Sequence, residues 1–371
     1  MTHRKGRQIS RRHAAGLSGV IAAVAVIAGL AAYSARQPTA SSGPGPSSVS
    51  PSSSAASRPS SSAATPTASP SLSAATSPAA RLIPTSGAYL GAYIQPSTYT
   101  PAGEIAAVQS FQRTVGATID LVHTYHAWFS PFPDAADRYF VKSGKVLLLT
   151  WSGTPDTRKI IAGSYDAQIT ARARAVKALG RPILLEFRHE MDRPNLQWVV
   201  HGPKNYIAAW DHIRAIFAKV GATNVGWVWC PTGWGFRDGR AQAFYPGNGE
   251  VDWVCADVYS DSTRQPLQEA AQPFLQWARS TNKPILIGEF GANGPPTALP
   301  NWLLAAGELA RMNKQIKGMA YFDANGTDSN GHPFSYWLGN HRPALSTFGA
   351  LLRWRYFQPN LPSSSPTPSP S

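Results

Sequence analysis

Residues 182–192 read PILLEFRHEMD, and residues 284–291 read PILIGEFG. In both stretches a short apolar run, of the length of a buried strand, leads to a glutamate: Glu190 in the first and Glu289 in the second. Such apolar runs are typical of parallel strands, because helices cover both faces of a parallel sheet. We therefore expect the two acids to stand at the carboxyl ends of parallel strands.

Strand-like runs recur through the middle of the chain, and stretches with apolar residues three or four apart lie between them. This alternation predicts a parallel sheet. Eight such units fit a (β/α)8 TIM barrel of about 250 residues better than a doubly wound sheet, and no GxGxxG loop follows the first run. The predicted strands are residues 89–94, 118–124, 145–151, 182–188, 224–230, 251–257, 284–288 and 318–322, and the clearest helices are 165–179, 203–220, 266–280 and 301–314.

The amino-terminal end differs in composition from the barrel region. Residues 1–13 are strongly basic, and residues 14–33 read AAGLSGVIAAVAVIAGLAAY without a charge. The run is about as long as the roughly 20 residues that cross a bilayer, and small residues at its end would also allow cleavage. We expect residues 1–35 to be a signal peptide or a membrane anchor whose basic end stays inside the cell, and the rest to be extracellular or on the cell surface.

Two further segments have no capacity to form a packed core. Residues 36–83 consist largely of Ser, Pro, Ala and Thr, and residues 359–371 repeat this composition. Such segments cannot bury enough apolar surface to offset the entropy of ordering. We expect a disordered linker and a disordered tail on either side of one folded domain at residues 84–358.

The charge of the chain is concentrated at its amino-terminal end. The formal net charge is +14, but residues 1–81 hold eight Lys or Arg and no Asp or Glu, which leaves +6 on the rest. These remaining basic residues are scattered, so nucleic-acid binding has little support. We expect a monomer that needs no cofactor.

The two cysteines, Cys230 and Cys255, both fall near the ends of predicted strands. A disulfide is permitted in an exported protein. Buried free thiols are the alternative, and the sequence leaves both open.

The fourth predicted strand carries an unusual number of charges. Leu184, Glu186, Arg188 and Glu190 share one parity, so these side chains should point into the barrel. Buried charges need partners. We expect Glu186 and Arg188 to pair with each other and Glu190 to be free at the rim.

Two carboxyl groups at one end of a barrel suit the cleavage of glycosidic bonds, in which one acid protonates the leaving oxygen and the other faces the anomeric carbon. Aromatic rings stack on the apolar faces of sugars, and polar side chains bind their hydroxyl groups. Residues of both kinds follow the predicted strands. They are His123, His126, Trp128, Trp151, His189, Trp229, Trp234, Asp257, Tyr259, Phe322 and Asp323.

Two other kinds of site have little support in the sequence. His123 and His126 lie three residues apart in a strand-to-loop segment, no HExxH motif occurs, and neither cysteine falls in a zinc-like cluster. A GxSxG elbow of serine hydrolases is also absent from the sequence. We expect no metal site and no nucleophilic serine.

The folded part resembles glycoside hydrolase family 26, which is best known for β-mannanases and belongs to a clan of retaining (β/α)8 glycosidases. The resemblance rests on HEM at 189–191 and GEFG at 288–291, and on LGAYI, HTYHAWF, TWSG, WVWCP and FYPGNGEVDWVCADVY elsewhere. It implies that Glu190 is the general acid/base and Glu289 the nucleophile. It also implies that Tyr259 hydrogen-bonds the nucleophile, that Asp257 matches the family acid two residues before this tyrosine, and that His189 helps to bind the sugar or to tune the acid. Arg188, at a different offset from the family arginine, is a further candidate supporting residue.

The chain departs from the family around the acid. Family members commonly have HEMNG with a tryptophan five residues after the acid, whereas this chain has Asp192 and Arg193, with Asn195 at that position and Trp198 three residues later. The arginine often found four residues before the acid is replaced by Glu186. These changes affect the expected sugar contacts and leave the glutamate pair intact.

The resemblance implies an endo-acting, retaining β-glycosidase whose first expected substrate is β-mannan or glucomannan. The altered acid loop keeps mixed-linkage β-glucan and β-xylan as alternatives. A surface-tethered barrel that binds polysaccharide without cleaving it is the non-enzymatic alternative. The chain is expected to be secreted or tethered to the membrane through residues 1–35.

Overall fold

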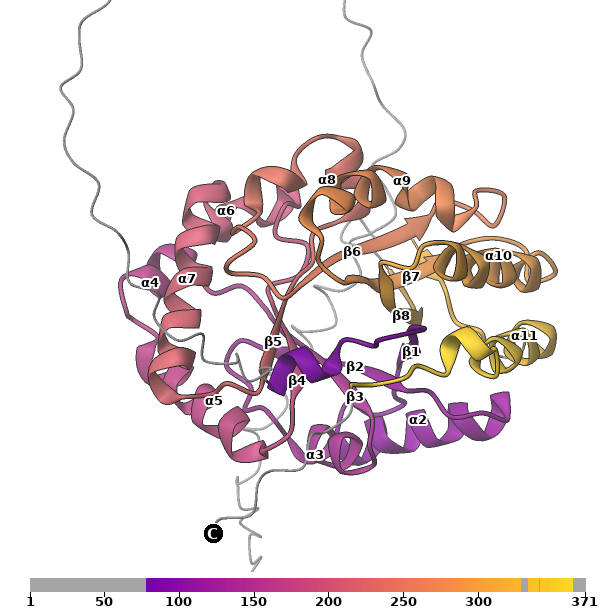
Figure 1. Ribbon diagram of the computed structural model, residues 1–371, viewed down its shortest axis with the longest axis horizontal. Helices are drawn as coiled ribbons and strands as arrows, with labels where there is room; N and C mark the ends of the chain where they lie inside the picture. Colours follow the sequence, from indigo (N-terminus) through magenta and orange to yellow (C-terminus); the bar gives the residue numbers. More distant parts are fainter. Residues whose placement is uncertain (1–77, 328–332, 340, 363–371) are drawn as a thin grey trace, which may run out of the picture.

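The computed structural model describes residues 78–327, 333–339 and 341–362, which form a closed parallel barrel surrounded by helices (Figure 1). The expected signal or anchor, most of the linker and most of the tail lie outside these residues. In the described part of the chain, no helix is long and apolar enough to cross a membrane.

The strands pair in sequence order from β1 to β8, and β1 closes the barrel on β8. The predicted (β/α)8 barrel is therefore correct, and each predicted strand overlaps an observed one. The strands are β1 (Tyr89–Ile94), β2 (Leu121–Ala127), β3 (Val146–Ser152), β4 (Ile183–Phe187), β5 (Val225–Trp229), β6 (Trp253–Ser260), β7 (Ile285–Ala292) and β8 (Ile316–Asp323), with a hairpin of β9 (Asn325–Thr327) and β10 (Pro333–Ser335) after the last.

Helices follow the strands and cover the outside of the barrel (Figure 1). The α-helices are α2 (Pro101–Val115), α3 (Ala135–Lys142), α4 (Thr157–Ile161), α5 (Asp166–Leu179), α6 (Gln197–Val200), α7 (Gly202–Val220), α8 (Gly233–Arg237), α9 (Leu267–Ala278), α10 (Leu299–Met312) and α11 (Arg342–Leu352). The 3₁₀ turns are η1 (Pro78–Leu82), η2 (Pro194–Leu196), η3 (Ala241–Phe244), η4 (Arg279–Thr281) and η5 (Arg355–Phe357).

Local sequence signals define the helix ends. Thr100 caps α2 by accepting a hydrogen bond from the Gly103 amide, and Pro101 occupies the first turn, where no amide donor is needed. The same helix ends at Gly116, whose φ of 65° is in the left-handed region that glycine adopts without strain. These signals place the loops at the strand ends.

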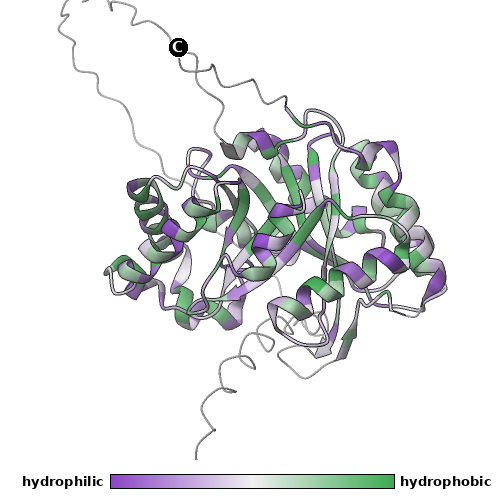
Figure 2. Ribbon diagram, turned by 90° about the horizontal axis from the view of Figure 1, so that it is seen from below, coloured by the Kyte–Doolittle hydropathy of each residue, from purple (hydrophilic) through white to green (hydrophobic). Residues whose placement is uncertain are grey.

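Two layers of buried side chains result from the alternation along the strands. One set, including Leu148, Leu184 and Leu286, packs inside the barrel, and the larger set, including Leu149 and Leu185, packs between strands and helices. Figure 2 shows the hydrophobic strands at the centre and mixed colouring on the surrounding helices. The interior is therefore a filled core with room for chemistry only at its ends.

The packed body extends beyond both expected domain boundaries. Leu82, at the end of η1, joins the interior cluster, and its carbonyl accepts a hydrogen bond from the Tyr89 hydroxyl. At the other end, the Asn360 amide donates to the Ser86 carbonyl. The segments just before residue 84 and just after residue 358 thus close the amino-terminal end of the barrel.

Candidate active site

Glu289 reaches the barrel interior through an irregularity in β7. Ala256 of β6 pairs with Ile287, whereas the next residue, Asp257, pairs with Glu289, so Gly288 is an extra residue that forms a β-bulge. A Cβ atom on Gly288 would lie 2.6 Å from Cys255 Sγ and 2.7 Å from Asp257 Oδ1. Only glycine fits at this position, and the bulge turns the Glu289 side chain inward.

Two phenols hold the Glu289 carboxylate from both sides. The Tyr259 hydroxyl of β6 donates to Oε2 at 2.5 Å, and the Tyr125 hydroxyl of β2 donates to Oε1. The contact with Tyr259 agrees with the resemblance. Sequence analysis missed Tyr125, although strict alternation from His123 along β2 would have placed both side chains on one face.

Glu190 lies in a tight turn directly after β4. Arg188 and Glu190 have positive φ angles of 48° and 53°, a conformation that side chains other than glycine adopt rarely. The Glu190 amide donates to the Cys230 carbonyl at 2.7 Å, which ties this turn to the end of β5. The turn directs a buried carboxyl toward the same interior as Glu289.

The sequence predicted a Glu190 carboxyl that is free at the rim, and the structure contradicts this. Oε2 of Glu190 lies 2.7 Å from Nη1 of Arg193, three residues further on, and the Glu190 side chain is almost completely buried. Oε1 has no hydrogen-bond partner among the described residues. One oxygen of this acid is thus paired with a cation, and the other is available to carry a proton.

Both acids bind protons more readily than ordinary glutamates. Burial raises the pKa of Glu289 to about 8, and the charge of Glu190 adds to this, although the two phenols lower it. Burial also raises the pKa of Glu190, against the lowering effect of Arg193. The hydrogen bond from Tyr259 therefore favours the ionised form of Glu289, as predicted, but burial outweighs it.

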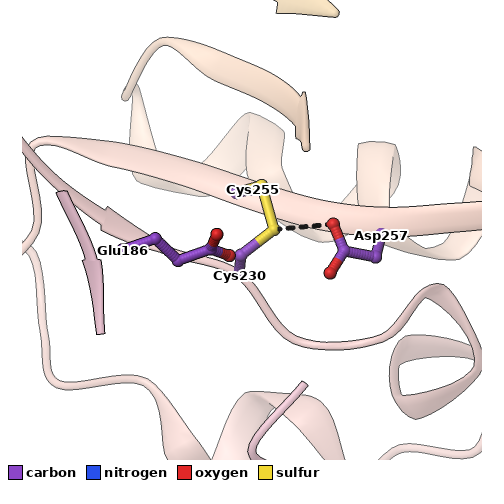
Figure 3. A group of neighbouring side chains, drawn as sticks. All are labelled: Glu186, Cys230, Cys255 and Asp257. Atoms are coloured by element: carbon purple, nitrogen blue, oxygen red, sulfur yellow. Dashed lines mark hydrogen bonds between the residues drawn. A yellow bond between two sulfur atoms is a disulfide. The ribbon is translucent and has the colours of Figure 1, made fainter. Parts of the chain in front are cut away.

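A second pair of acids, Glu186 and Asp257, lies next to a disulfide (Figure 3). Cys230 and Cys255 are joined, which decides between the two alternatives left by the sequence. Cys230 Sγ lies 3.3 Å from Asp257 Oδ1, and since a disulfide sulfur carries no proton, only a protonated Asp257 can donate there. Burial and the surrounding carboxyl groups raise the pKa of Asp257 well above its ordinary value.

Glu186 is on the opposite side of the disulfide from Asp257 (Figure 3). The expected pair with Arg188 is wrong, because the strand alternation ends at Phe187 and the positive φ of Arg188 turns its side chain elsewhere. Arg188 Nη2 instead donates to the Pro155 carbonyl at 2.8 Å. Glu186 is hydrogen-bonded to Thr150 of β3, and burial raises its pKa to about 8.

Two neutral histidines lie beside the acids. Burial lowers the pKa of both His123 and His189 to about 3. His123 Nε2 lies 2.7 Å from Thr150 Oγ1, and the His189 ring packs edge-on against Tyr125 at 5.7 Å between ring centroids. Of the three predicted histidines, these two are in the site.

An aromatic cluster adjoins the acids at the carboxyl end of the barrel. Predicted members Trp234, Tyr259 and Phe322 belong to it, and Trp234 is half-buried. Its other members were not predicted. They are Tyr93, Tyr125, Phe334 and Tyr336.

Three predicted tryptophans lie elsewhere. Trp128 and Trp151 stack on each other at 4.0 Å between centroids in the layer between strands and helices, and Trp229 packs against Trp277 of α9 in the same layer. Trp151 and Trp229 have the outward parity of their strands, opposite to Thr150 and Val228. They are core residues, and their prediction as sugar contacts was wrong.

Two predicted polar residues, His126 and Asp323, also lie away from Glu190 and Glu289. His126 points outward from β2 and pairs with Asp137 of α3 at 2.8 Å. Asp323 is buried at the end of β8, where its Oδ1 accepts the Leu338 amide. Both residues have structural partners.

Two groups of side chains bring several potential metal ligands within 4.8 Å of one another among the described residues. In one, Glu186 and Asp257 accompany sulfurs that are already joined as a disulfide. The other group consists of His126, Asp134 and Asp137. Asp134 caps α3, and Asp137 accepts hydrogen bonds from the Thr124 hydroxyl and the Asp134 amide. The disulfide removes both sulfurs of the first group as thiolate ligands, and in the second group both carboxylates already accept hydrogen bonds from the protein.

Comparison with known proteins agrees with this geometry. Residues 147–295 match the model of glycosyl hydrolase family 26. Endoglucanase H of Acetivibrio thermocellus is 31% identical over 268 residues, covering 66% of this chain and 29% of that protein. Residues 147–295 of this chain thus form a glycosyl hydrolase family 26 domain. A β-1,3-xylanase of a Vibrio species is 30% identical over 151 residues, covering 38% of this chain and 30% of that protein.

Solved structures share the fold of this chain. The β-mannanase from a symbiotic protist of the termite Reticulitermes speratus has a TM-score of 0.54 and 14% identity, covering 74% of this chain and 88% of that chain. This chain spans less than a third of the length of the endoglucanase and of the β-1,3-xylanase.

Residues 192–198, which follow the HEM motif, form a segment that is held at one end. Asp192 accepts hydrogen bonds from both the amide and the hydroxyl of Thr232, at 2.9 and 2.7 Å, which fixes the segment against the start of α8. Asn195 is exposed, and the Trp198 side chain is 67% exposed on α6. Trp198 is therefore not held in the aromatic cluster.

Proposed function

We propose that this chain is a retaining endo-β-glycosidase that hydrolyses internal bonds of a β-linked polysaccharide. The observation that carries the proposal is the arrangement of Glu190 and Glu289. Both are buried at the carboxyl end of one barrel, one with a cation on a single oxygen and the other with a phenol on each oxygen. No cofactor is required for this chemistry.

In the first step Glu289 attacks the anomeric carbon while Glu190 gives its proton to the departing glycosidic oxygen. The unpartnered Oε1 of Glu190 is suited to carry that proton. The phenols of Tyr125 and Tyr259 favour the ionised form of Glu289, because each donates its proton to a carboxylate oxygen. The carboxylate left on Glu190 is stabilised by Arg193.

In the second step Glu190 takes a proton from water, and the resulting hydroxide equivalent displaces Glu289 from the sugar. Two inversions at one carbon give net retention. The aromatic cluster around Trp234 and Phe322 offers planes on which sugar rings can stack. His189, next to the acid, adds a buried ring nitrogen, Nδ1, without a partner among the described residues.

We take β-mannan or glucomannan as the first substrate, from the HEM and GEFG motifs. A mixed-linkage β-glucan or a β-xylan is the second candidate. It is favoured by the altered loop, in which Asn195 stands where mannanases commonly have tryptophan, and by relatives named endoglucanase and β-1,3-xylanase. We further propose that residues 1–35 direct the chain out of the cell and that the Ser/Pro-rich linker holds the barrel at the surface.

The test is an assay of the full chain on mannan, glucomannan, mixed-linkage glucan, β-1,3-xylan and β-1,4-xylan, next to E190A and E289A. Cleavage of one polymer, with a loss of at least about 1,000-fold in each variant, is the expected result. Full activity in either variant would contradict the assignment. Binding without cleavage would favour a surface-tethered binding barrel, and an inverted first product seen by NMR would exclude double displacement.

A further inference from the structure

A continuous chain of hydrogen-bonding groups links Glu186 to Glu289 through the barrel interior. Glu186 Oε2 is bonded to Thr150 Oγ1, which lies 2.7 Å from His123 Nε2. On the other side of the ring, His123 Nδ1 lies 3.2 Å from the Tyr125 hydroxyl, which is bonded to Glu289 Oε1. The chain runs through β4, β3, β2 and β7, and its members are almost entirely buried except for Tyr125, which is partly buried.

The direction of one hydrogen bond in this chain determines all the others. The Tyr125 hydroxyl and the Thr150 hydroxyl each have one proton, and a neutral His123 ring has one N–H. If Tyr125 donates to Glu289, the ring must donate from Nδ1 to the phenol oxygen. Nε2 must then accept from Thr150, and the Thr150 oxygen must accept its bond from a protonated Glu186.

The opposite direction follows if Glu186 is ionised. Glu186 then accepts the Thr150 proton, and His123 donates from Nε2 to Thr150. Tyr125 must in turn donate to Nδ1, so Glu289 loses one of its two phenols. Each order is complete for these five groups, and the His123 ring also hydrogen-bonds the Gly288 backbone, which gives its N–H an acceptor outside the chain.

The surroundings of Glu186 favour its neutral form. It faces His123 of β2, Thr150 of β3, the Cys230–Cys255 disulfide between β5 and β6, and Asp257 of β6, with an Asp257 oxygen within 4.8 Å of its own. An ionised Glu186 would in turn raise the pKa of Glu190 and of Glu289. Among the described residues, His123 is the only basic side chain within ion-pair distance of Glu186. Burial keeps its ring neutral, so it supplies no positive charge.

We propose that Glu186, held in its protonated form, sets the proton order of this chain so that Tyr125 donates to Glu289. Glu186 is then a positioning residue for the nucleophile, acting across four hydrogen bonds. The inference rests on the proposed function only where it calls Glu289 the nucleophile. It gives a role to the glutamate that replaces the arginine often found at this position of the family.

The two orders differ by a balanced shift of protons. The Glu186 proton passes to Thr150, the Thr150 proton to Nε2, the Nδ1 proton to Tyr125, and the Tyr125 proton to Glu289. Glu186 ends as a carboxylate and Glu289 as a neutral acid, Thr150 and Tyr125 are chemically unchanged, and His123 is left as its other tautomer. Glu186 and Glu289 thus share one proton, which is carried by Glu186 in the first order and by Glu289 in the second.

The ring tautomer of His123 reports the order directly and requires no substrate. The full chain, labelled with ¹⁵N in its nine histidines, is titrated from pH 5 to 9.5, and the His123 signals are assigned by their absence in H123Q. We expect the Nδ1–H tautomer at low pH and a change to Nε2–H as Glu186 ionises. An Nε2–H tautomer over the whole range would overturn the proposal.

Matched variants show whether the tautomer depends on Glu186. In E186Q position 186 no longer ionises, so the His123 tautomer should not change with pH. T150V interrupts the chain and should abolish the change, while T150S keeps the hydroxyl and should preserve it. A wild-type tautomer change in T150V, or in E186Q, would refute the coupling even if the chain cleaves no polysaccharide. If E186Q does not fold, the two Thr150 variants still decide the question.

Discussion

The Tyr259 hydroxyl lies 2.5 Å from Oε2 of Glu289, and the two residues stand on neighbouring strands, β6 and β7. The β-bulge at Gly288 creates this relationship, because it turns Glu289 toward the face of the sheet that carries Tyr259. The phenol opposes the effect of burial on the carboxyl group. Its removal therefore has a defined consequence.

In Y259F the pKa of Glu289 should rise further, because one of two donors to the carboxylate is lost. The nucleophile must be ionised, so the acid limb of the pH profile of kcat/KM should move to higher pH. A hydrogen bond to a charged group contributes about 1.5–3 kcal/mol, which corresponds to a loss of roughly 10–100-fold in kcat/KM. Y245F, which removes a hydroxyl bonded to Asn248 in a distant loop, is the control. An unshifted acid limb in Y259F would contradict the role of the phenol.

Replacement of Arg193 should move the other limb of the profile. The guanidinium lowers the pKa of Glu190, so R193Q should leave this acid protonated to higher pH and extend the alkaline limb. R193K keeps the charge and should shift the limb less. The measurement is kcat/KM against pH for the three proteins. Coincident alkaline limbs for wild type and R193Q would show that Glu190 is not the group that titrates there.

The buried acids make stability depend on pH. Burial raises the pKa of Glu186 and of Glu289 from an ordinary 4.5 to about 8. A carboxyl with a higher pKa in the folded state stabilises that state fully below pH 4.5, and this contribution is lost as the pH rises toward 8. We expect the free energy of unfolding in urea to fall between pH 5 and 8 in wild type, and to fall less in the E186Q/E289Q double variant. Equal slopes in both proteins would rule out this source of pH dependence.

Substitution of Gly288 tests the bulge. A methyl group there would meet Cys255 Sγ, Asp257 Oδ1 and Cys230 Sγ, all within 2.9 Å. Overpacking of this kind costs about 1–3 kcal/mol, and displacement of the bulge should also reduce activity by misplacing Glu289. G249A is the matched control, because the same methyl group meets no atom within 4 Å there. Urea unfolding of both variants gives the comparison, and equal stabilities would mean that the bulge tolerates a side chain.

Alternation along a strand predicts the site only where the strand stays regular. Asp257 and Tyr259, two residues apart on β6, share the inner face as regular alternation requires. It failed on β4, where the positive φ of Arg188 ended the pattern and left Glu186 without its expected partner. The aromatic residues Trp128, Trp151 and Trp229 were placed at the correct strand ends but on the wrong side of the wall.

The sequence by itself determined the eight strands, the barrel and the two glutamates, because apolar runs and helical spacing are local patterns. Only the tertiary structure decided which side chains share the interior. The extra residue at Gly288, the disulfide between Cys230 and Cys255, and the approach of Tyr125 to Glu289 depend on the register between neighbouring strands. Register is set by pairing across the barrel, and a shift of one residue moves a side chain to the opposite face. The path from Glu186 to Glu289 crosses four strands, and no single stretch of sequence contains it.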